Sequence, residues 1–120
     1  MNGEVLERRG TGTARFEITN RTGQPAVVKL RDATGRPAAS VFLTPGNNAS
    51  VGDLPDTEYR PEFAVGELWS RACNDFAAGM RAQRFAGYAL PSGWSPLVIP
   101  PPPSAARGLE EISEAAFERE

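Results

Sequence analysis

The sequence predicts an all-β fold, an antiparallel β-sandwich of about seven strands with a short helical excursion and a short C-terminal helix. Stretches of alternating apolar and polar residues recur between residues 13 and 65, as half-buried strands require. Turn-forming Gly, Pro and Asn separate them at intervals of roughly 8–12 residues, a spacing typical of sandwiches and barrels. The connections do not require helical crossovers, so antiparallel pairing is expected.

Seven stretches carry the strand pattern, and their apolar faces predict the core. The stretches are residues 13–20, 26–32, 38–46, 49–55, 59–65, 84–90 and 94–100. In the first, Phe16 and Ile18 share one face, and polar residues alternate with them on the other. The side chains expected to form much of the core are Val28, Leu30, Val41, Leu43, Tyr59, Phe63, Phe85 and Leu97.

The stretch LPDTEYRPEFAVGELW, residues 54–69, has the cleanest alternation in the chain and also contains a proline. Tyr59, Phe63 and Val65 fall on one face, which indicates a contribution to the core. Pro61 has no backbone N–H to donate to a neighbouring strand. It therefore predicts that this strand lies at a sheet edge or carries a bulge.

Helical spacing is expected in two places. Near residues 67–79 apolar residues fall at helix-like offsets and Gly79 is a stop signal, although an irregular connection between strands is the alternative. Near residues 109–118, Ile112 and Phe117 lie close to one helical face and glutamates cover the other. That acidic face is interpreted as solvated, with docking to a partner as the alternative.

The chain is expected to form one domain with two appended segments, since 120 residues suffice for a single core. We expect residues 1–12 to form a flexible N-terminal arm and residues 13–100 to form the β-sandwich. Residues 101–120 are expected to form a proline-rich linker with a short acidic helix. The prolines from Pro100 to Pro103 favour an extended spacer, with a ligand for an aromatic groove as the alternative.

The composition removes the common catalytic arrangements. The chain has no histidine, which excludes Ser-His-Asp and Cys-His catalysis and histidine metal sites. Cys73 is the one cysteine, so neither an intrachain disulfide nor a thiolate cluster can form. Arg71 could activate it, but a buried structural thiol is the preferred interpretation. The sequence therefore predicts no enzyme, no cofactor and no metal, and catalysis by dispersed carboxylates ranks last.

Charge and hydropathy bound the partners and the compartment. A net charge of −2 gives no global field that would attract nucleic acid or anionic lipid. The N-terminal sequence has no apolar segment typical of a signal peptide, and no run is long enough for a membrane-spanning helix. Localisation stays open between the cytoplasm and an excised soluble part of an envelope-associated protein. A homo-oligomer also stays open.

Aromatic residues in the second half of the chain are the candidate contact residues. Trp69, Tyr88 and Trp94 either complete the core or form a stacking platform for a peptide or a sugar ring. The candidate partner- or ligand-binding residues are Glu67, Trp69, Tyr88 and Trp94. Two further patterns, Asn20-Arg21-Thr22 and Asn48-Ala49-Ser50, match the glycosylation acceptor and are interpreted as turn asparagines.

The span VVKLRDATGRPAASVFLTPGNNASVGDLPDTEYRPEFAVG resembles the small transthyretin-like or carboxypeptidase-regulatory-like sandwich modules. The match is carried by the D-x-x-G turn at Asp32–Gly35, by Leu54-Pro55 and by Tyr59–Phe63. The chain departs from the pattern where Asp56 or Thr57 replaces a glycine, and again at Pro61. The wider span from Phe16 to Phe117 resembles uncharacterised bacterial accessory modules. That resemblance implies a fold and a non-catalytic attachment, and supplies no catalytic residue.

These observations predict a non-catalytic binding or assembly module. It would mediate protein–protein interaction as an accessory or structural component of a larger bacterial assembly, through an exposed strand edge or its Trp-bearing end. The alternative is a carbohydrate- or small-ligand-binding sandwich.

Overall fold

The computed structural model describes residues 4–8, 10, 12–55, 57–66, 68–70, 75–78, 80–85, 97–99 and 109–118. Within these ranges the strands are β1 (Glu4–Arg8), β2 (Ala14–Asn20), β3 (Ala26–Arg31), β4 (Pro37–Leu43), β5 (Asn48–Leu54), β6 (Arg60–Val65), β7 (Leu68–Ser70), β8 (Asp75–Ala78), β9 (Arg81–Phe85), β10 (Leu97–Ile99) and β11 (Leu109–Ile112). One short helix, α1 (Glu114–Glu118), follows β11. The all-β prediction is confirmed, with more strands than the sequence predicts.

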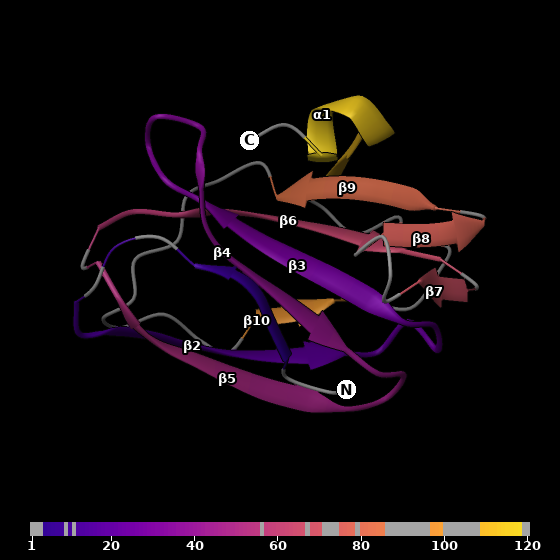
Figure 1. Ribbon diagram of the computed structural model, residues 1–120, viewed down its shortest axis with the longest axis horizontal. Coiled ribbons are helices and arrows are strands. Elements are labelled where there is room, and N and C mark those ends of the chain that lie inside the picture. Colours follow the sequence, from indigo (N-terminus) through magenta and orange to yellow (C-terminus); the bar gives the residue numbers. More distant parts are fainter. Residues whose placement is uncertain are drawn as a thin grey trace.

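Two sheets form the layers of the fold (Figure 1). The larger has the strand order β1-β4-β3-β6-β9-β11, and every neighbouring pair in it is antiparallel. The smaller has the order β10-β2-β5, in which β2 pairs antiparallel with β5 and parallel with β10. Strands β7 and β8 form a separate two-stranded ribbon. In Figure 1, α1 lies over β9, on the side of the larger sheet away from β2 and β5.

The main core lies between the two sheets, where the inward faces of the alternating strands meet. Six of the residues predicted for it are buried: Val28, Leu30, Val41, Leu43, Tyr59 and Phe63. Phe85 is half-buried and packs against this cluster, with its ring centroid 5.9 Å from that of Phe63. Leu97 lies in β10, and its side chain is outside the described part of the structure. The apolar period of two therefore located this core correctly.

A second apolar cluster covers the opposite face of the larger sheet. It consists of Val27, Phe42, Ala64, Ala82 and Phe117, with Met80 and Ile112 packed at its border. The sheet is therefore buried on both faces, and β4 has no exposed residue along its length. Phe117 belongs to α1, so the terminal helix covers part of this face.

Two of the turns that carry the family resemblance have clear physical causes. Asp32 Oδ1 accepts hydrogen bonds from the backbone N–H groups of Thr34 and Arg36, at 2.9 and 3.2 Å. Gly35 follows with a φ of 86°, a conformation that glycine adopts without a steric penalty. Tyr59 donates its hydroxyl to the carbonyl of Pro55, which closes the connection between β5 and β6.

Pro61 does not mark a sheet edge, because β6 lies between β3 and β9. The edge prediction is therefore wrong. Pro61 stands opposite Leu30 of β3, whereas pairing with β9 begins one residue later, at Glu62. At that position β9 does not require a backbone N–H from β6, so an interior strand tolerates proline near its start.

Three other local predictions differ from the structure. The helical excursion near 67–79 is wrong, because the described part of that segment forms β7 and β8. Short apolar runs fit helix and strand periods about equally well, and cross-strand pairing decided the outcome here. The arm at 1–12 contains β1, which pairs with β4 across a bulge. The helix near 109–118 is confirmed only at Glu114–Glu118, since β11 extends the sheet beside β9.

No helix in the described ranges combines the length and apolarity needed to cross a membrane.

Candidate functional site

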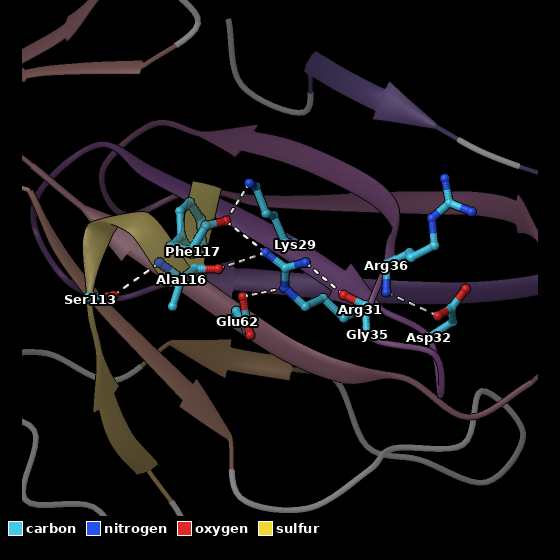
Figure 2. Close-up of polar contacts among 9 residues, drawn as sticks. All are labelled: Lys29, Arg31, Asp32, Gly35, Arg36, Glu62, Ser113, Ala116 and Phe117. Atoms are coloured by element: carbon cyan, nitrogen blue, oxygen red, sulfur yellow. Dashed lines mark hydrogen bonds and ion pairs between the residues drawn. The ribbon is translucent and has the colours of Figure 1, made fainter. Parts of the chain in front are cut away.

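The most elaborate polar arrangement among the described residues joins α1 to the outer face of the larger sheet (Figure 2). Ser113 begins the helix as its N-cap, since its Oγ accepts a hydrogen bond from the backbone N–H of Ala116 at 3.0 Å. The N–H of Phe117 then donates to the carbonyl of Ser113 at 3.0 Å. This single turn places the Phe117 ring against the sheet and leaves the last helical carbonyls facing β3.

Arg31 of β3 binds those carbonyls. Its Nη2 donates to the carbonyl oxygens of Ala116, at 3.1 Å, and Phe117, at 2.8 Å. The same guanidinium donates through Nε to Glu62 of β6 at 2.6 Å and through Nη1 to the carbonyl of Gly35 at 2.8 Å. Carbonyls at a helix end have no partner within the helix, so a cation at this position stabilises the helix terminus.

Lys29, two residues earlier on the same face of β3, makes a second set of contacts with Phe117. Its Nζ donates to the Phe117 carbonyl oxygen and also lies 4.6 Å from the centroid of the Phe117 ring. An ammonium group over an aromatic face is attracted by the ring quadrupole. Lys29 is the single lysine of the chain, so this contact can be followed chemically without interference from other lysine side chains.

The charges around this contact are complementary. Cross-strand pairing places Lys29, Glu62 and Arg84 in one row, and Arg31 opposite Arg60 in the next. Residues directly opposite each other share a face, so along β3, β6 and β9 these rows carry four cations and one anion. The first row continues through Ser40 to Glu7 of β1, and from Arg84 to Glu110 of β11. Residues 109–118, which form the edge strand β11 of this sheet and the helix α1 packed over it, contain four glutamates and neither lysine nor arginine. An acidic segment therefore meets the part of the sheet face, on β3, β6 and β9, where cations are in excess.

Of the four residues predicted from sequence as contact residues, the structure describes only Trp69. Glu67, Tyr88 and Trp94 are outside the described residues. Trp69 lies in β7, where the register pairs it with Phe76 of β8. The structure therefore neither assembles nor separates the predicted aromatic platform. Cys73 and the run Pro100–Pro103 are likewise outside the described residues.

The docking of α1 was missed from sequence, although two signals were present. The outward face of β3 carries Val27 beside two cations, an apolar component that a fully solvated strand face does not need. The tail carries an apolar stripe, Ile112 and Phe117, that requires a surface to cover it. Combining these two signals would have predicted that the segments meet.

Besides this site, described residues line two shallow hollows. One lies on the smaller sheet and is lined by Glu17, Thr19, Asn48, Ala49 and Ser50. The other is lined by Gly10, Asp32, Ala38, Pro55, Thr57 and Tyr59. The first presents a carboxylate, an amide and two hydroxyls, and is therefore the more polar. Across the described residues, no group of three or more Cys, Asp or Glu side chains is placed to hold a metal ion.

No family model, no curated protein and no solved structure matches this chain. The resemblance to transthyretin-like modules therefore stays a prediction carried by the turn and core residues named above.

Proposed function

We propose that this protein is a non-catalytic binding module that mediates protein–protein interaction, as an accessory or structural component of a larger bacterial assembly. The observation that carries the proposal is the pairing of the two outermost strands of the larger sheet. In the described part of the chain, β1 and β11 each pair with a neighbouring strand on one side only. A strand with an unpaired side offers N–H and C=O groups at regular spacing, which another chain can extend.

The β1 edge is the better of the two for adding a partner strand. Strand β11 leads directly into α1, which packs back over β6 and β9. Strand β1 has a bulge between Val5 and Glu7, and beyond it the register with β4 is regular at Glu7 and Arg8. A bulge at an edge limits continuous pairing and leaves a short segment for specific addition.

The test uses two neighbouring proline substitutions, Glu7→Pro and Arg8→Pro, in the full chain. Successive residues of a strand direct their N–H groups to opposite sides, so one substitution removes a β1–β4 hydrogen bond and the other removes one at the open side. Urea melts show which of the two variants has lost the β1–β4 hydrogen bond, because that variant is less stable than the wild type. The other variant, changed at the open side, should keep wild-type stability and lose the partner recovered by affinity purification with wild-type bait. Equal partner recovery with that stable variant would argue against edge pairing.

A second candidate function is binding of a carbohydrate or another small polar ligand, and the hollow on the smaller sheet favours it. Glu17 pairs with Ser50, and Thr19 with Asn48, across β2 and β5. These side chains line the hollow with groups that hydrogen-bond sugar hydroxyls. Isothermal titration of a glycan panel against the wild type and Glu17→Gln should show binding that the variant weakens. Tryptophan fluorescence of the same samples tests Trp69 and Trp94, and no signal from either method excludes this function.

A further inference from the structure

We propose that the outer face of the larger sheet is a binding site for a short acidic segment, and that its occupant in an assembly is the β11–α1 segment of a second copy of this chain. The site is named here the outer-face site: an apolar floor of Val27, Phe42, Ala64 and Ala82, with Lys29, Arg31 and Glu62 beside it. This inference rests on the proposed function, because it gives the binding module one specific partner.

The chemistry of recognition is visible in the contacts that the chain makes with itself. Arg31 and Lys29 bind main-chain carbonyls at the end of α1, and the apolar floor receives one large side chain, Phe117. The segment also places Glu110 opposite Arg84, a cation in the same cross-strand row as Lys29 and Glu62. None of these features depends on the segment belonging to the same molecule. The same segment from a second copy would therefore make the same contacts.

The outer-face site is organised independently of its occupant. Two of the acceptors of Arg31, Glu62 and the Gly35 carbonyl, belong to the sheet layer itself and hold the guanidinium in position. The main core lies on the other face of the sheet and forms a separate cluster that does not include Phe117. Departure of the β11–α1 segment would therefore leave the sandwich core intact and expose a preformed site.

The link between β10 and β11 favours exchange. Nine residues, 100–108, separate these strands, and the first four are prolines. Proline-rich sequences favour an extended, semi-rigid backbone, so the composition of the link is that of a spacer able to carry the segment to a neighbouring copy. When two copies exchange an identical element, every contact is reproduced, so the link decides between the closed monomer and the exchanged dimer.

The test is a complementation between two full-length variants. Phe117→Ala keeps the outer-face site and disables the segment, whereas Ala82→Glu blocks the site with a bulky anion and keeps the segment. The probe is acetylation of Lys29, measured by mass spectrometry with one chain isotopically labelled. Each variant alone should show a reactive Lys29. In the mixture, only Lys29 of the Phe117→Ala chain should be protected, and its rate of acetylation should fall about tenfold when nine-tenths of the sites are occupied. Native mass spectrometry should show a one-to-one pair.

Two controls make every outcome decisive. Mixing Phe117→Ala with the double variant Ala82→Glu/Phe117→Ala should give no protection, because neither chain then offers an intact segment. A synthetic peptide of residues 108–120 added to Phe117→Ala should protect Lys29 if the outer-face site has stayed folded. Protection by the peptide without protection by the Ala82→Glu chain overturns exchange between copies. Protection by neither overturns the site itself. The β1 proline variants test a different edge, so failure of the proposed edge pairing is distinguishable from both outcomes.

Discussion

Arg31 and Glu62 form a buried ion pair across β3 and β6, with Arg31 Nε 2.6 Å from Glu62 Oε1 and side-chain exposures of 7% and 3%. Burying two charges costs solvation free energy that their mutual attraction offsets only with good geometry and further hydrogen bonds. Arg31 has those further bonds, to the carbonyls of Gly35, Ala116 and Phe117. The pair therefore connects the sheet to the segment docked on it.

Removing both partners of this pair should cost less than the two single removals added together. Arg31→Met leaves the Glu62 carboxylate buried without its cation, and we expect a loss of about 3–5 kcal/mol in the free energy of unfolding. Glu62→Met should be costly for the converse reason. The double variant should lose clearly less than the sum of the two single losses. Urea melts of the four proteins give the coupling free energy.

The exposed pair Arg81–Glu111 is the matched control for that cycle. Its charged atoms lie 3.6 Å apart and its side chains are 63% and 75% exposed. Water screens such a pair, so Arg81→Met should change stability by less than about 1 kcal/mol. Equal losses from Arg31→Met and Arg81→Met would show that burial of the first pair has no energetic consequence.

Asn20 should be far more important for stability than Asn48, although both begin the same three-residue pattern. Asn20 is buried, and its amide donates to the carbonyl of Gln24 at 2.7 Å while its oxygen accepts from the N–H of Thr22 at 3.0 Å. Asn20→Ala leaves these groups without their partner, and a loss of about 1–3 kcal/mol is expected. Asn48 is exposed, so Asn48→Ala should have a small effect. Thermal melts compare the two.

What the sequence could predict follows from the range of the interactions involved. Alternation is local, so Phe16 and Ile18 were placed on the buried face from eight residues of sequence. Turn chemistry is local as well, and Asp32 behaves as its pattern predicts. Edge or interior position is not local. Pro61 was misplaced because the partner on its second side, β9, is distant in sequence and begins pairing one residue later.

The outer-face contact was missed for a similar reason. Lys29 and Phe117 are 88 residues apart, and no single window contains both. Each half had a simpler local interpretation, a solvated strand face and a solvated acidic helix. Only the three-dimensional pairing shows that one half covers the other. The aromatic site predicted at Trp69 stays a prediction.

Gly12 should not tolerate a side chain, for reasons of space. A Cβ added there would overlap the Leu54 carbonyl oxygen and lie 2.7 Å from the Cα of Pro55. These are backbone atoms that cannot move aside independently, so Gly12→Ala should cost about 1–3 kcal/mol. Gly52→Ala is the control, since its nearest new contact would be Arg15 Cγ at 3.8 Å. Similar melting temperatures for the two variants would contradict the close approach of Gly12 to the β5 terminus.

Phe63 and Phe117 should have different effects, because they belong to different clusters. Phe63 lies in the main core, so Phe63→Ala should lower the free energy of unfolding by about 3–5 kcal/mol, and Phe63→Leu by less. A loss below about 1 kcal/mol would show that Phe63 is not a core residue.

Phe117→Ala opens only the outer cluster. It should therefore expose Lys29 to acetylation under conditions where the rest of the chain stays folded, whereas Phe63→Ala should expose Lys29 only as the whole domain unfolds. Comparing the urea dependence of Lys29 acetylation in the two variants separates local release of the segment from global unfolding.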